Sequence, residues 1–193
     1  MSNAHEPTST TWRARGGWTL GWEFRRWFRC VLSALPGAIG SWARVRLYSF
    51  CAVGTDVAIM ENGWIDYSSQ VALGSHVSLN RGVLINAQGG LTVGDWTMIG
   101  PKVTIYTQKH AVDACNIPRA LREDTLAPVS IGKDCWIATG VMILAGVDIG
   151  DGSVVAAGSV VTRSVPSGVL VAGVPARFVR RIVETCPEQQ HEE

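Results

Sequence analysis

A repeat of six residues constrains this chain more than any other feature. From Ile131 the sequence reads IGKDCW, IATGVM, ILAGVD, IGDGSV, VAAGSV and VTRSVP, which is six hexads without a break. Ile or Val opens each hexad, the second residue is usually small, and the fifth is Cys, Val or Ser. A fixed period of this kind is typical of an architecture that stacks one structural unit on the next.

The same phase continues upstream of Ile131. Two short insertions interrupt it, namely Val71-Ala72 and two residues in the hexad that begins at Ile85. The upstream hexads open at Val53, Ile59, Ile65, Leu73, Leu79, Ile85, Val93, Ile99 and Ile105. The total is fifteen hexads, which group as five triplets.

Each hexad is interpreted as a short strand followed by a turn, with its first aliphatic residue pointing inward. Three hexads then close one triangular coil, and coils stack at the strand spacing of about 4.8 Å. We therefore predict an all-β fold, a parallel β-helix of about five coils over residues 51–175. A β-sandwich is disfavoured, because its strands alternate with period two and its turns recur every 8–12 residues.

Three segments fall outside the repeat. Within residues 1–50 we predict an amphipathic helix that ends at Pro36-Gly37, followed by a second helix over residues 38–51. The first helix carries an apolar stripe formed by Phe24, Trp27, Phe28, Val31, Leu32 and Leu35. This segment either caps the first coil or docks on a membrane surface as basic, Trp-containing helices do. We expect residues 111–130 to form a projecting loop, and loops this long inside a compact repeat tend to be functional. We expect residues 176–193 to form a closing helix and a tail.

Composition narrows the classes of function. The net charge is only +1, divided as +5 over residues 1–50 and −4 over the rest, which disfavours nucleic-acid binding. The polar start MSNAHEPTST lacks the apolar run of a signal peptide, and the five cysteines form no CxxC pair. We expect a cytoplasmic protein, located at the inner face of the membrane if the first segment docks there.

Among four histidines, His110 is the candidate for catalysis. His5 and His191 lie in the terminal tails and His76 lies on a turn, where a structural role is favoured, whereas His110 directly precedes the long loop. An imidazole, whose ordinary pKa is about 6.5, suits proton removal at neutral pH. A carboxylate is expected to orient the ring, and Asp113 and Glu123 are the candidates from the loop.

The hexads and the C-terminal run AAGSVVTRSVPSGVLVAGVPARFVRRI resemble the hexapeptide-repeat acetyltransferases, especially the maltose and galactoside O-acetyltransferases and the colanic acid and other polysaccharide biosynthesis acetyltransferases. The resemblance covers about residues 53–182. It implies a left-handed β-helix, a homotrimer, and transfer of an acetyl group from acetyl-CoA to a hydroxyl without a metal. The family's Thr-x-x-His-Pro-x-Asp context matches Thr107, His110 and Asp113, with Ala111 where Pro is usual. A similar loop acid in the family favours Glu123 over Asp113 as the acid that orients His110.

The same resemblance assigns the two substrates to further residues. For the acceptor, it points to Asn80 and Trp136 together with the loop acids Asp113 and Glu123; Asn80 could equally serve only its turn, and Trp136 only packing between subunits. For acetyl-CoA, it points to backbone groups at Thr139 and Ala157 for the pantetheine arm, and to Thr162, Arg163, Arg177 and Arg180 for the phosphates.

Several alternatives remain open from the sequence. An amino-sugar N-acetyltransferase or an antibiotic O-acetyltransferase would use the same acetyl donor. A γ-class carbonic anhydrase shares the fold, but it needs three histidine ligands, and only His76 and His110 lie outside the tails. A non-catalytic β-helix is disfavoured by the intact C-terminal run. No GxxxxGK[ST] loop is present, which argues against an ATP-dependent reaction.

Overall fold

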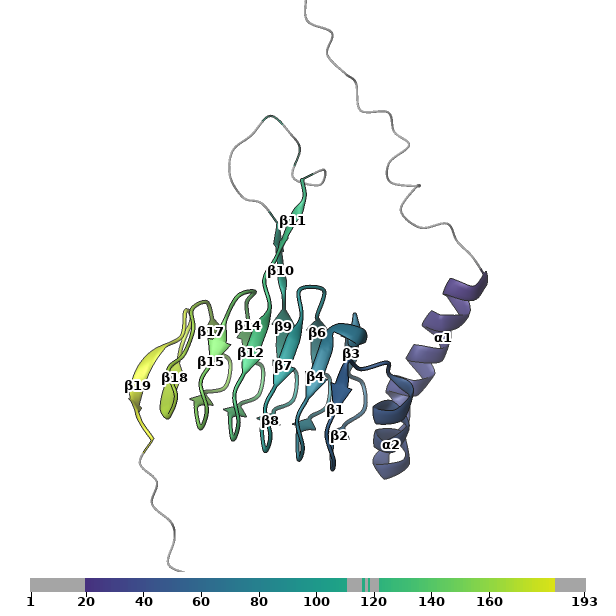
Figure 1. Ribbon diagram of the computed structural model, residues 1–193, viewed down its shortest axis with the longest axis horizontal. Coiled ribbons are helices and arrows are strands. Elements are labelled where there is room, and N and C mark those ends of the chain that lie inside the picture. The colour runs from purple at the N-terminus through teal and green to yellow at the C-terminus, as the bar shows by residue number, and fades with distance from the viewer. Residues whose placement is uncertain (1–19, 111–115, 117, 119–121, 183–193) are drawn as a thin grey trace, which may run out of the picture.

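The computed structural model describes residues 20–110, 116, 118 and 122–182. The hexads form a parallel β-helix with two helices at one end, and a hairpin rises from one side (Figure 1). The prediction of an all-β parallel β-helix of about five coils is confirmed, and residues 165–172 add part of a sixth turn.

Three parallel sheets form the three sides of the coils. Sheet A contains β1 (Ala52–Val53), β4 (Val71–Leu73), β7 (Leu91–Val93), β12 (Val129–Ile131) and β15 (Asp148–Ile149). Sheet B contains β2 (Ala58–Ile59), β5 (Ser78–Leu79), β8 (Met98–Ile99), β13 (Trp136–Ile137), β16 (Val154–Val155) and β18 (Val169–Ala172). Sheet C contains β3 (Trp64–Asp66), β6 (Leu84–Asn86), β9 (Thr104–Tyr106), β14 (Met142–Ile143) and β17 (Val160–Val161). The chain passes from A to B to C in each coil, so we name the turns between them the AB, BC and CA corners; a short 3-10 helix, Ser68–Gln70, lies at the CA corner of the first coil.

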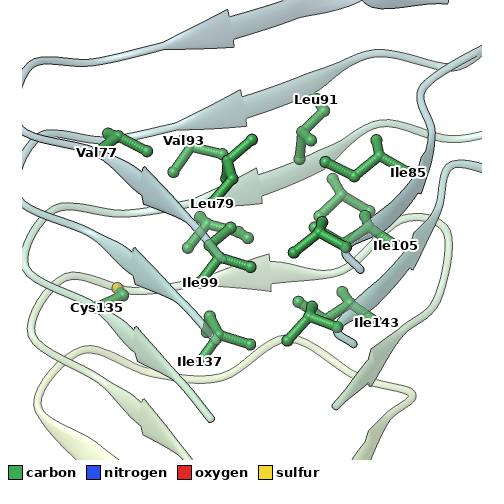
Figure 2. Close-up of a cluster of buried hydrophobic side chains, with 14 of the residues drawn as sticks. Val77, Leu79, Ile85, Leu91, Val93, Ile99, Ile105, Cys135, Ile137 and Ile143 are labelled. Carbon is green, nitrogen blue, oxygen red and sulfur yellow. The ribbon is translucent and has the colours of Figure 1, made fainter. Parts of the chain in front are cut away.

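The hexad pattern places the core where it was predicted. Of the fifteen opening residues, all but Val53 at the open first coil are at most 3% exposed. Figure 2 shows how Ile99 and Ile137 stack in one column and Ile105 and Ile143 in another. The fifth positions are filled by small or β-branched side chains such as Thr97, since the interior is narrow. One coil could not bury these side chains alone, and the stack therefore supplies the stability.

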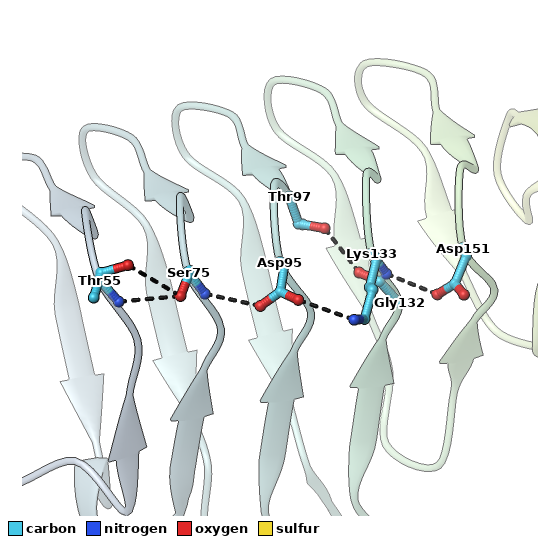
Figure 3. Close-up of polar contacts among 7 residues, drawn as sticks. All are labelled: Thr55, Ser75, Asp95, Thr97, Gly132, Lys133 and Asp151. Carbon is cyan, nitrogen blue, oxygen red and sulfur yellow. Dashed lines mark hydrogen bonds and ion pairs between the residues drawn. The ribbon is translucent and has the colours of Figure 1, made fainter.

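Polar side chains connect successive coils along the AB corner (Figure 3). Ser75 Oγ accepts the Thr55 N–H at 3.1 Å, and Asp95 Oδ1 accepts the Ser75 N–H at 2.9 Å. Lys133 Nζ lies 3.0 Å from Asp95 Oδ2, and Asp151 Oδ1 accepts the Lys133 N–H at 2.7 Å. The Ser75 N–H and then the Lys133 ammonium group hold the pKa of the Asp95 carboxyl below its usual range. These contacts satisfy turn amides that the sheets leave unpaired.

The two predicted N-terminal helices are present as α1 (Leu20–Ala34) and α2 (Gly37–Leu47). The second ends four residues earlier than residue 51, because the chain extends from Tyr48 to enter the first coil. Helix α2 packs on β2 and buries Ala43 and Arg44 there. Gly40 permits the close helix contact, since a Cβ there would lie 2.1 Å from the Leu35 carbonyl oxygen.

The structure differs from the capping interpretation in how much of the apolar stripe of the first helix it buries. Of that stripe only Leu32 is buried, while Phe24, Trp27, Phe28, Val31 and Leu35 are 40–73% exposed. The capping interpretation therefore holds for α2 and for Leu32, but the rest of the α1 stripe does not cover the coil.

The predicted closing helix after Ala176 is wrong for the residues that the structure describes. Arg177–Arg181 form strand β19, which runs antiparallel to β18 at the end of sheet B. The physical reason is that β18 would otherwise leave a row of unpaired N–H and C=O groups at the sheet edge. The tail from residue 183 lies outside the described residues.

Candidate active site

An open groove runs along sheet B and the BC corner, with a volume of about 480 Å³. Four of the predicted site residues line it, namely Asn80, Trp136, Thr139 and Ala157. They come from the second, fourth and fifth coils, because hexads in constant phase place corresponding positions one above the other. Trp136 is half exposed and forms an apolar wall, while Thr139 and Ala157 occupy the turn.

Asn80 lines the groove and also contacts the backbone of its own turn. Its Oδ1 accepts the Arg81 N–H at 2.8 Å, as expected of an Asn that closes a turn. The side chain is exposed and lines the groove next to Ser78. The turn role is therefore confirmed, and an additional contact with an acceptor stays a prediction.

The predicted loop begins as a hairpin arm rather than as irregular chain. Strand β10 (Gln108–His110) pairs antiparallel with β11 (Asp124–Leu126), and the arm rises from the β-helix (Figure 1). Thr107 is fully buried at its base, where its hydroxyl donates to the Asn86 carbonyl at 3.0 Å and accepts the Gly89 N–H at 2.7 Å. The Thr107 carbonyl accepts the Ala127 N–H at 2.9 Å, so both legs of the arm are fixed to one coil.

His110 lies on β10 directly opposite Asp124 on β11. Its Nδ1 contacts Asp124 Oδ1, and 72% of the His110 side chain is exposed. A carboxylate at Nδ1 fixes the ring and favours the tautomer whose Nε2 is free to accept a proton. His110 therefore has the surroundings of a general base, with an oriented ring on a largely exposed side chain.

Sequence reasoning missed Asp124, the acid that contacts His110. Glu123 is exposed and lies next to Asp124, before β11 begins, while Asp113 lies outside the described residues. The pairing of His110 with Asp124 depends on the register of a hairpin whose strands are separated by thirteen residues. A preference for antiparallel pairing around the loop could have suggested a cross-strand acid, but nothing in the sequence fixed the register.

The residues assigned to the acetyl-CoA phosphates divide into two groups. Thr162 and Arg163 are exposed at the CA corner, directly after β17. Arg177 and Arg180 are exposed on β19, where Arg180 pairs with Leu170, a residue that lines the groove. The two arginines on β19 therefore lie beside one end of the groove, and Arg163 lies at the corner that also carries the arm.

Within one chain, His110 and the groove occupy different corners of the triangle. The groove follows sheet B and the BC corner, whereas the arm leaves the chain after sheet C, at the CA corner. In Figure 1 the arm rises from the upper side of the β-helix, while the groove strand β8 lies on the lower side. A single chain therefore does not bring the base and the groove together.

His76 lies at the third corner, with a structural environment. Its backbone φ is +59° at the AB turn, its Nδ1 lies 3.0 Å from Asp56 Oδ2, and its ring stacks on Trp96 at 3.8 Å between centroids. The structural role expected for His76 agrees with these contacts. Within residues 20–110 and 122–182, no three His, Cys, Asp or Glu side chains form a group able to hold a metal ion.

Comparison with known proteins places this architecture in a family. Residues 128–163 match the model for the bacterial transferase hexapeptide (six repeats). Nodulation protein L of Rhizobium meliloti is 37% identical over 184 residues, covering 92% of this chain and 91% of that protein. Galactoside O-acetyltransferase of Escherichia coli is 37% identical over 128 residues, or 63% of this chain, and the match spans only 62% of that enzyme's length.

A solved structure extends the similarity to three dimensions. The hexapeptide-repeat acetyltransferase VCA0836 of Vibrio cholerae, crystallised with acetyl-coenzyme A, superposes with a TM-score of 0.74. The two chains are 29% identical, and the superposition covers 88% of this chain and 93% of that chain. The hexad core is in place, and one relative is 37% identical across 92% of the chain. The chain therefore belongs to the hexapeptide-repeat acetyltransferase family.

Proposed function

We propose that the protein transfers an acetyl group from acetyl-CoA to a hydroxyl of a sugar or other small acceptor, with His110 as the general base. The observation that carries the proposal is the pairing of His110 Nδ1 with Asp124 on an arm anchored at both legs. Family membership supplies the acetyl donor, since a relative with the same fold was crystallised with acetyl-CoA.

The proposed reaction uses Nε2, the ring nitrogen of His110 that does not contact Asp124. Nε2 takes the proton of the acceptor hydroxyl as its oxygen attacks the thioester carbonyl carbon. The tetrahedral intermediate then collapses, the C–S bond breaks, and the imidazolium returns its proton to the leaving thiolate. The products are the acetyl ester and free coenzyme A, and the negative charge of the Asp124 carboxylate stabilises the ring while it is protonated.

The groove has the features needed to bind acetyl-CoA, the acetyl donor. Its walls are apolar at Trp136, Met98 and Leu170, and its turn backbone at Thr139 and Ala157 offers polar groups to a pantetheine amide. Arg177 and Arg180 lie beside its end and would contact phosphates through their paired donors. Asn80, at the other part of the groove, would contact the acceptor.

A homotrimer resolves the separation between base and groove. A CA corner of one subunit placed against the groove of its neighbour would bring together His110, Arg163 and Thr162 from one chain with Thr139 and Ala157 from the other. The outer faces of sheets B and C favour such contact, because they expose large apolar side chains such as Met98, Leu84 and Met142. Each active site would then contain two subunits.

Mixing two inactive variants tests whether the site is shared. Ala157→Trp should abolish acetyl-CoA binding, because the exposed Ala157 lines the groove and an indole would fill it. His110→Ala should bind acetyl-CoA but not turn it over. When the two are unfolded, mixed equally and refolded together, activity should return to about a quarter of wild type, since random assembly places intact partners at that share of interfaces. Mixtures that stay inactive, although both variants assemble, would contradict a shared site.

A thiol-release assay tests the reaction itself. Purified protein should release free coenzyme A from acetyl-CoA faster when a saccharide acceptor with free hydroxyls is present. A matched panel of sugars, the corresponding amino sugars and hydroxylated antibiotics then identifies the acceptor. Faster release with amino sugars alone would favour an N-acetyltransferase, and no release with any member of the panel would count against hydroxyl acetylation.

A further inference from the structure

Helix α1 is oriented with its polar side toward the protein. Arg29 and Ser33 are half-buried between α1 and the first coil, and Leu32 is buried there. The Arg29 guanidinium donates to the Ile65 carbonyl, lies 3.6 Å from Asp66 and covers the Trp64 ring at 5.0 Å from its centroid. These contacts fix the rotation of α1 about its own axis.

The fixed rotation turns the apolar side of α1 toward solvent. Phe24 is 73% exposed, Trp27 70% and Val31 60%, and Phe28 and Leu35 extend the same face. We call these five residues the α1 stripe. On α2, Ile39 and Trp42 are also exposed, at 80% and 63%. An amphipathic helix normally buries its apolar side on the protein that carries it, so the α1 stripe requires another surface.

The charges of the two helices indicate which surface. Residues 20–50 contain five arginines and one glutamate. Arg29 and Arg44 contact the first coil, and both Arg26 and Arg46 are exposed. A helix with Trp and Phe on one side and arginines at its margins matches an anionic lipid surface, where rings enter the interface and guanidinium groups contact phosphates.

We propose that α1 docks the protein on an anionic lipid bilayer through the α1 stripe. The helix would lie in the plane of the surface, with the β-helix and its arm outside the lipid. No helix within the described ranges is long and apolar enough to cross a bilayer. The proposal does not depend on the acetyltransferase activity, and its test measures binding alone.

Co-sedimentation of the full chain with vesicles tests the proposal. Wild-type protein should sediment with vesicles of phosphatidylcholine and phosphatidylglycerol, less with phosphatidylcholine alone, and less again when salt is raised, because salt screens the arginines. Trp27→Ser should lower the partition constant at least about fivefold, since a large aromatic contact is lost.

Trp96→Ser is the matched control. Trp96 is 61% exposed but lies at the AB corner of the third coil, far along the chain from the helices, and its replacement should leave vesicle binding unchanged. The proposal is wrong if wild-type protein ignores anionic vesicles, or if both Trp variants bind equally. It is also wrong if Trp27→Ser changes only the molar mass measured by light scattering, because the α1 stripe would then be a contact between copies of this chain.

Discussion

His110→Ala is expected to lower kcat by roughly 10²–10⁴-fold, the usual contribution of a positioned general base. The affinity for acetyl-CoA should change little, because His110 acts on the proton of the acceptor hydroxyl and not on the nucleotide. Steady-state kinetics with the acceptor identified above, together with calorimetry of acetyl-CoA binding, separate the two effects. The acid limb of the pH–rate profile should also disappear in the variant, because the protonating ring is gone.

Two neighbouring acids provide a matched comparison for this prediction. Asp124→Asn should lower kcat less than His110→Ala, because the ring remains but the carboxylate that orients it at Nδ1 is lost. Glu123→Gln changes the adjacent exposed acid, which does not face His110 across the hairpin, and should leave the profile unchanged. Near-normal turnover in His110→Ala would refute the mechanism, and a profile altered by Glu123→Gln alone would assign the orienting role to Glu123.

Arg44→Met is expected to cost roughly 2–4 kcal/mol of unfolding free energy, as estimated from hydrogen bonds made by charged groups. Arg44 is fully buried under the helical cap. Its Nε donates to the Ile59 carbonyl at 2.8 Å, and its Nη1 donates to the carbonyls of Leu32 at 3.0 Å and Leu35 at 2.6 Å. Met fills similar space but leaves these acceptors buried and unpaired.

Thermal unfolding measures this loss. The melting temperature should fall by roughly 5–15 °C, from the usual conversion for a chain of this size. Burial lowers the pKa of the Arg44 guanidinium, and the nearby Glu61 carboxylate opposes that shift. Arg46→Met is the control on the same helix, because Arg46 is exposed and its replacement should stay within about 0.5 kcal/mol of wild type. Equal stability of the two variants would show that Arg44 does not hold the cap.

The core could be predicted from the sequence because it follows from a period, whereas the groove residues were assigned from the family resemblance. Once Ile99 and Ile137 open hexads in the same phase, their burial in one column is fixed by the geometry of stacked coils. The same phase brings Asn80, Thr139 and Ala157 to one groove, although they lie up to 77 residues apart. The position of His110 directly before the long insertion marked it as the candidate. The sequence did not predict that His110 would lie on a hairpin arm.

Tertiary contacts decided the structure of the segments that lie outside the hexad repeat. An amphipathic stripe has the same pattern whether it faces a coil or a lipid, and contacts of Arg29 turn the α1 stripe outward. Arg177–Arg181 has no strong preference of its own, and the open edge of β18 makes it a strand. Asp124 became the partner of His110 through hairpin register. Sequence alone determined the β-helix and its core, because a periodic pattern repeats one local rule. The tertiary structure alone decided the pairings that join segments without a period.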